Sequence, residues 1–390
     1  MMQKKIVINY EFLEEIIRIK SYDSDGKNKC ADRISDELEQ IGFDVKIFKG
    51  YGAPIIYAEY VVGAEKNILF YSHYDVKPEG NINEWRTNPF EPYFNSEEGR
   101  IYARGSGDDK GQIYATIMGI KNAISKKEKI QYNISLLIEG DEESGSNGLC
   151  DFSKKELSDK FYDTVIINDS HWLNDNPVIY CGCRGQLDIK LKYTVTHMKE
   201  NYHAGNYGGL YNGAARDFIS ILKSILQKID IIIEQEPTTK EYFGNAASLT
   251  YISSGDEKRS LIPKKAIARI DVRYNNRNIV KSIENVLDKI ARRYGIEYEF
   301  MQNEEGFFNL PDERFISKAK AIIDDVTGLN TKIIDYCGAY LPLNKLKNVC
   351  GIKYIIPFAQ SDECNHSPNE NIAITNLVYG IEIIEKLLIN

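Results

Sequence analysis

The chain has 390 residues, of which 43% are hydrophobic and 27% charged, and its formal net charge is −8. This length exceeds one ordinary core and predicts two domains, or one large domain with an insertion. The acidic balance, with lysines and arginines spread among the acids, argues against a nucleic-acid partner. Because we find no membrane-spanning apolar run and no apolar signal region, we expect a cytoplasmic protein without a membrane partner.

The first part of the chain alternates strands with helices. Nearly continuous apolar runs predict buried strands at 66–76, 132–140 and 163–170. Between the first two strands, residues 110–127 place isoleucines on one face of a helix. This order predicts an α/β fold with a mostly parallel sheet and flanking helices.

The pattern changes near residue 184. Apolar and polar residues alternate in 186–195 and again in 266–274, as in half-exposed strands of an antiparallel sheet. Helical patterns follow at roughly 211–229 and 278–294. We therefore expect an inserted α+β domain at 185–301. The remaining residues, 1–184 and 302–390, then form the catalytic domain, which ends in an apolar helix at 371–388.

The segment NISLLIEGDEESGSNG, residues 133–148, begins as a strand. Three consecutive acids, Asp141, Glu142 and Glu143, follow that strand. Like charges this close repel one another, and each resists leaving water. Such a cluster at the end of a buried strand indicates that a cation lies nearby.

Other acids and histidines follow the neighbouring strands of the outer domain. The carboxyl ends of parallel strands meet at one edge of a sheet, where sites commonly form. A mixed set of imidazoles and carboxylates suits zinc or a similar divalent ion, and two such ions would neutralise the acids. Asp75 is suited to fix the tautomer of His73 from behind. The set comprises His73, Asp75, Asp108, Glu142, Glu143, Asp169 and His366.

With these motifs the sequence resembles the M20 metallopeptidases, especially their dipeptidase branch, which includes the carnosinases. The resemblance covers nearly the whole chain. It implies a zinc-peptidase-like catalytic domain with an inserted dimerisation or lid domain. The motifs that carry it, in order, are HYDVKP, EWRTNPFEP, IYARGSGDDKG, IEGDEESGS, YCGCRG, YHAGNYGG, SLIPKKAIARIDVR and HSPNE.

The resemblance implies two metal ions, Zn²⁺ or alternatively Mn²⁺ or Co²⁺, that share Asp108 as a bridging ligand. His73 and Asp169 match the other ligands of one metal, and Glu143 and His366 match those of the second. In this family the peptide bond that follows the bridging aspartate is typically cis.

The resemblance also implies the catalytic and substrate-binding roles. Glu142 matches the general base, which can take a proton from water because it lies next to a ligand without being one. His203 matches a histidine that reaches the active site of the neighbouring subunit of a homodimer, where it can stabilise the oxyanion. Arg273 matches an arginine that binds the substrate carboxylate, although an arginine on an alternating strand is by itself usually a solvated residue.

Two motifs depart from the family pattern. The family often carries GGSIP near the substrate carboxylate, whereas this chain has GAYLP, with Tyr340 in place of the small serine. The motif before His203 is NYHAG instead of DLHSG. Both changes concern the identity of the substrate and leave the metal ligands intact.

Three functions remain as hypotheses. The first is a dinuclear metal-dependent dipeptidase that cleaves dipeptides or short peptides with a free C-terminal carboxylate. The second is a deacylase or amidohydrolase of the same fold that acts on an N-acyl amino acid or a related metabolite. The third is an inactive metal-binding scaffold, which we would expect to lack Glu142 or one of the ligands.

Overall fold

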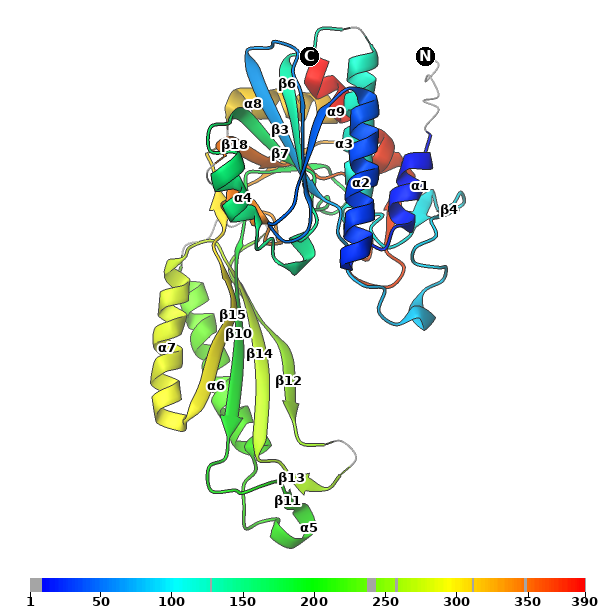
Figure 1. The fold of residues 1–390 in the computed structure, drawn as a ribbon. Helices are drawn as coiled ribbons and strands as arrows, with labels where there is room; N and C mark the ends of the chain where they lie inside the picture. Colours follow the sequence, from blue (N-terminus) through cyan, green and yellow to red (C-terminus); the bar gives the residue numbers. More distant parts are fainter. Residues whose placement is uncertain are drawn as a thin grey trace. The chain divides into compact units, whose positions relative to one another are not determined.

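The computed structural model describes residues 9–126, 128–236, 243–256, 259–310, 312–346 and 349–389, drawn as a ribbon in Figure 1. These residues form two compact units. The second takes those of Cys183–Phe308 and Asp335–Leu341, and the first takes the remainder. Residues 183–184, 302–308 and 335–341, which the sequence assigns to the outer domain, thus belong to the second unit.

The first unit is built on a sheet that contains eight strands of the described chain. In spatial order the strands are β1 (Asp44–Phe48), β2 (Ile55–Tyr60), β6 (Tyr132–Glu139), β3 (Lys66–His73), β7 (Phe161–Ile167), β18 (Cys350–Ile355), β8 (Val178–Tyr180) and β17 (Lys332–Ile334). The central strands β6, β3, β7 and β18 pair in parallel, whereas β1 and β2 pair antiparallel at one edge. The predicted α/β fold with a mostly parallel sheet is therefore confirmed.

The register of the central strands brings their carboxyl ends level. His73 pairs with Glu139 at the ends of β3 and β6. Ile167, the last residue of β7, pairs with Tyr71 on one side and with Ile355 on the other. The segments that follow these strands consequently leave the sheet at one edge.

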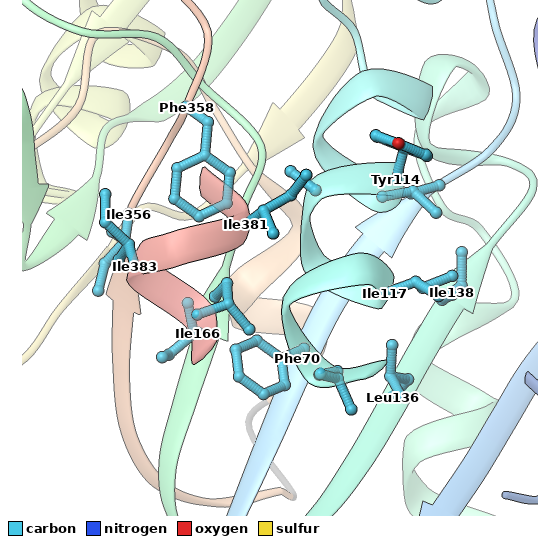
Figure 2. Packing of buried hydrophobic residues seen from close by; sticks show 14 of the residues in the cluster. Phe70, Tyr114, Ile117, Leu136, Ile138, Ile166, Ile356, Phe358, Ile381 and Ile383 are labelled. Atoms are coloured by element: carbon cyan, nitrogen blue, oxygen red, sulfur yellow. The ribbon is translucent and has the colours of Figure 1, made fainter. Parts of the chain in front are cut away.

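Two helices, α3 (Lys110–Ser125) and α9 (Ile374–Ile389), pack against each other and against the sheet, as Figure 2 shows. Glycine allows the close approach, since a Cβ atom at Gly119 would lie 2.7 Å from the backbone oxygen of Ile381. The other helices of this unit are α1 (Glu11–Arg18), α2 (Ser24–Ile41), α4 (Leu149–Glu156) and α8 (Glu313–Thr327).

A small antiparallel sheet corrects the predicted start of the last helix. The sequence suggests a helix throughout 371–388, but the first residues form strand β19 (Asn371–Ala373), and α9 begins only at Ile374. These residues are extended because β19 pairs with β5 (Arg100–Tyr102) in a small sheet, in which β5 also pairs with β4 (Tyr93–Asn95).

The second unit is a four-stranded antiparallel sheet with two helices packed on one face. The alternating apolar residues of β10 and β14 supply its core, as their pattern predicts. The predicted helices are also present and form α6 and α7. The strands are β12 (Ala246–Ser254), β14 (Lys265–Tyr274), β10 (Gly185–Thr194) and β15 (Ile296–Glu304), the helices are α6 (Ala214–Gln235) and α7 (Asn278–Tyr294), and the short elements are β9 (Gly182–Cys183), β11 (Tyr202–His203), α5 (Ala204–Tyr207), β13 (Leu261–Ile262) and β16 (Phe307–Phe308).

Among the described helices, none combines the length and the apolar character required to cross a bilayer.

Candidate metal centre

Most of the predicted ligands follow the carboxyl ends of the central strands. His73 is the last residue of β3, and Glu142 and Glu143 form the short 3-10 turn Glu142–Ser144 after β6. Asp169 follows β7 by two residues, while Asp108 precedes α3 by two. His366 comes from the loop after β18 and is the most exposed of the set.

These side chains form two groups, in each of which three potential ligand atoms lie within 4.8 Å of one another. The groups mix imidazole nitrogen with carboxylate oxygen, the donors that divalent zinc and related ions accept in proteins. One group contains His73, Glu142 and Asp169, and the other contains Asp108, Glu143 and His366.

Asp108 joins the two groups. Its Oδ1 atom lies 2.9 Å from Nε2 of His73, and its Oδ2 atom lies 3.1 Å from Nε2 of His366. Asp169 Oδ2 is 3.8 Å from the same nitrogen of His73, and Glu143 Oε1 is 3.0 Å from that of His366. Asp108 therefore presents one carboxylate oxygen to each group. The peptide bond between Asp108 and Asp109 is cis, as the family resemblance leads us to expect.

Asp75 contacts both the ring of His73 and the backbone of the turn that carries Glu142 and Glu143. Its Oδ1 atom lies 3.4 Å from Nδ1 of His73, and its backbone oxygen lies 3.1 Å from the same nitrogen. The backbone amides of Glu142 and Glu143 donate to its two carboxylate oxygens, each at 3.1 Å. Asp75 is thus placed to orient both the histidine and the turn that carries the two glutamates.

The three consecutive acids that the sequence groups together have different partners. Asp141 accepts a hydrogen bond from Nζ of Lys27 at 2.6 Å and lies outside both ligand groups. Lys77 approaches Glu143, with its Nζ atom 3.0 Å from Oε2. The cations near the acid cluster therefore include two lysines whose partners the sequence does not reveal.

Burial is the largest influence on the pKa values of the acids in this centre. Burial raises the pKa of Glu142 and of Asp169 well above their usual values, and neighbouring carboxylates add to the effect, whereas His73 opposes it. Burial would by itself lower the pKa of His73, but contacts with Asp108 and Asp75 raise it well above its usual value. A bound cation favours the ionised form of these carboxylates. The residues present therefore fit a divalent-metal site.

His203, Arg273 and Tyr340 belong to the second unit. His203 is exposed at the start of α5, where its Nδ1 atom accepts a hydrogen bond from the backbone amide of Gly205 at 3.1 Å. The hydroxyl of Tyr340 donates to Oε2 of Glu304 at 3.3 Å.

Arg273 lies on β14 and pairs with a carboxylate of its own strand. Its Nε atom donates to Oδ1 of Asp271 at 2.8 Å, and its Nη2 atom contacts Oδ2 of the same residue at 3.3 Å. Gln186 donates to that second oxygen at 2.8 Å, so Asp271 holds the guanidinium along one side. The pair with Asp271 uses Nε and Nη2 of Arg273 and does not involve Nη1.

A separate cavity of about 890 Å³ lies at the opposite, amino-terminal ends of the strands. Its lining includes Lys66, Tyr132, Asp163 and Lys318, but none of the predicted ligands. The metal centre therefore lies outside this cavity.

The sequence profile of peptidase family M20/M25/M40 matches residues 69–390. The chain is 28% identical over 378 residues to a succinyl-diaminopimelate desuccinylase of Wolbachia pipientis, covering 94% of this chain and 89% of that one. It is 30% identical over 199 residues to the Beta-Ala-His dipeptidase of Rattus norvegicus, covering 48% and 39% of the two chains. The structure of the di-peptidase Dug1p from Saccharomyces cerevisiae is similar, with a TM-score of 0.81, 21% identity and coverage of 97% and 94%.

Proposed function

Since the chain belongs to peptidase family M20/M25/M40 and is a hydrolase, we propose that it cleaves the amide bond of a dipeptide or short peptide with a free C-terminal carboxylate. The observation that carries this proposal is the position of Asp108, which faces His73 with one oxygen and His366 with the other. A carboxylate placed in this way is suited to bridge two divalent ions.

In this proposal His73, Asp169 and Asp108 hold one ion, and Asp108, Glu143 and His366 hold the other. Two divalent ions held by these residues would polarise the scissile carbonyl and lower the pKa of the attacking water. We favour Zn²⁺ because the donor set includes two histidines, and Mn²⁺ or Co²⁺ are the alternatives. Asp75 keeps the ring of His73 in the orientation that leaves Nε2 free to bind.

Glu142 is the proposed general base. It takes a proton from the attacking water and passes it to the nitrogen of the leaving amine, a role that requires a carboxylate close to the reacting atoms. Support comes from its backbone amide, which Asp75 binds, and from its side chain, which lies with His73 and Asp169. Its Oε atoms could also bind the first ion, and the metal content of a Glu142 variant separates the two roles.

Arg273 is the proposed anchor for the C-terminal carboxylate of the substrate. Because Asp271 already occupies the Nε side of the guanidinium, we expect the substrate to bind at the Nη1 end. Tyr340 is proposed to line the same part of the site, where its bulk would limit the size of the C-terminal residue.

We further propose a homodimer that forms through the second unit, in which His203 of one chain stabilises the oxyanion in the site of its partner. Support comes from β12, an edge strand whose Leu249, Tyr251 and Ile252 are each at least 41% exposed. An exposed apolar edge strand is prone to pair with another copy of itself. An isologous dimer would bury the edge strand of both chains in one interface.

A cytoplasmic location is the accompanying proposal. Cys30, Cys150 and the exposed Cys364 are free thiols. Free thiols suit a reducing compartment.

A deacylase is the second candidate, because a succinyl-diaminopimelate desuccinylase matches nearly the whole length of the chain. The two reactions differ only in what lies on the acyl side of the amide. An inactive scaffold is disfavoured, because Glu142 and all the proposed ligands are present.

The experiment that separates these candidates is a panel of dipeptides, C-terminally amidated dipeptides and N-succinyl or N-acetyl amino acids, each assayed with Zn²⁺ and with Mn²⁺. A dipeptidase cleaves free dipeptides with the higher kcat/KM, whereas a deacylase prefers the acylated amino acids. Turnover of none of these amides by metal-loaded protein would contradict both candidates and favour the scaffold.

A further inference from the structure

The loop that carries Asp108 converges on a single buried carboxylate. The backbone amides of Gly105, Gly107 and Asp108 all donate to Oε1 of Glu370, at 2.9, 3.1 and 3.1 Å. The side chain of Glu370 is fully buried. Three N–H groups directed at one oxygen make an anion-binding concavity in the backbone, which is filled here by the protein's own carboxylate.

The second oxygen of Glu370 and its backbone reinforce this arrangement. Oε2 accepts a hydrogen bond from Nη1 of Arg104 at 2.6 Å, and the guanidinium of Arg104 lies over the ring of Trp85. The backbone oxygen of Glu370 accepts from the amide of Ala103 at 3.0 Å, just before β19 pairs with β5. Glu370 is therefore fixed from two sides and can hold the loop without moving itself.

We propose that Glu370 is a positioning residue for the metal centre, which holds the 104–108 loop so that Asp108 presents one oxygen to each metal site. This inference rests on the proposed function, in which Asp108 bridges two ions. Glu370 acts only through the backbone, since its carboxylate binds the amide of Asp108 and no ligand atom. Partners one shell away from a metal orient the ligands, and their loss commonly costs about 10- to 100-fold in metal affinity.

The alternative is that Glu370 and Arg104 form a buried ion pair that serves stability alone. Such a pair is costly to break, because one partner is left buried and uncompensated. A test must therefore measure metal binding on folded protein, separately from stability.

The decisive variant is Glu370→Gln. Glutamine keeps the size of the side chain, but one of its two ends is an NH₂ group, which must face either the guanidinium of Arg104 or the three backbone amides. Either orientation sets donor against donor. We expect the folded variant to bind Zn²⁺ about 10- to 100-fold more weakly, and its Co²⁺-loaded form to lose the spectroscopic coupling between two bridged ions.

The matched control is Glu37→Gln, which alters another buried glutamate that is paired with an arginine. Glu37 is buried on α2, and its Oε2 atom accepts from Nη2 of Arg33 at 3.1 Å, outside the 104–108 loop. This variant should bind Zn²⁺ and Co²⁺ as the wild type does.

Wild-type metal affinity in Glu370→Gln, or an equal loss in both variants, would overturn the positioning role. If Glu370→Gln does not fold, amide exchange of residues 103–110 in the metal-free wild type decides. Exchange as fast as in an unstructured peptide overturns the role, and protection supports it. A wild-type protein that binds no metal would instead overturn the proposed function, and with it this inference.

Discussion

His73 and Asp75 are coupled at the imidazole nitrogen that faces away from the other ligands. Nδ1 of His73 lies 3.1 Å from the backbone oxygen of Asp75 and 3.4 Å from its Oδ1 atom, while Nε2 points at Asp108. Asp75 is therefore placed to hold a proton on Nδ1, so that Nε2 is the nitrogen that would donate its lone pair to a bound metal.

Asp75→Asn should weaken metal binding about 10- to 100-fold, the usual cost of losing such a partner. In the variant an NH₂ group replaces one carboxylate oxygen of Asp75 and cannot accept a hydrogen bond from a backbone amide. The Glu142–Glu143 turn therefore loses one of the two hydrogen bonds that hold it. Equilibrium dialysis with Zn²⁺ measures the loss. An unchanged affinity would show that Asp75 does not position the ligands.

Metal-loaded wild-type protein should contain about two divalent ions per chain, because the six grouped side chains supply two sets of ligands joined by Asp108. His366→Ala should lower the content to about one. Asp141→Asn is the matched control, since Asp141 adjoins Glu142 in the sequence but pairs with Lys27. Elemental analysis of chelator-free preparations gives the count, and a wild-type value near zero would refute the dinuclear centre.

Glu142→Gln should lower kcat by about 10²- to 10⁴-fold, because the amide cannot accept the proton of the attacking water. The variant should keep both ions if Glu142 is a base only. Metal content and kcat are to be measured on the same preparation. Wild-type turnover would exclude Glu142 as the base, and loss of one ion together with activity would make it a ligand.

Arg273→Lys should lower kcat/KM for substrates with a free C-terminus by about 10- to 100-fold, since lysine cannot replace a charged, two-pronged contact. Metal content should not change. The control is a C-terminally amidated substrate, for which variant and wild type should differ little. An equal loss for both substrates would show that Arg273 does not bind the carboxylate.

Two inactive variants, His203→Ala and Glu142→Ala, should restore activity when their subunits exchange. In a mixed dimer, one site combines an intact Glu142 with an intact His203 from the partner, so activity should approach about half of the wild-type value. Exchange is to be verified by mass labelling. No recovery despite proven exchange would place His203 in the site of its own chain or outside catalysis.

The sequence predicts these strands well because their apolar patterns are local and strong. The runs predicted at 66–76, 132–140 and 163–170 contain β3, β6 and most of β7. The prediction failed at 371–373, where pairing with β5 overrode a pattern that continues into α9. Backbone pairing with a distant strand leaves no trace in local periodicity.

The sequence by itself determined which residue types stand at the ends of the buried strands, and therefore that histidines and carboxylates would gather at one edge of a parallel sheet. Only the tertiary structure decided which partner each of these charged side chains contacts. It pairs Asp141 with Lys27, turns one oxygen of Asp108 toward each histidine, and binds the loop before Asp108 to Glu370. The positions of the strands along the chain follow from short apolar patterns, whereas the partner of a charged side chain depends on which distant loops fold beside it.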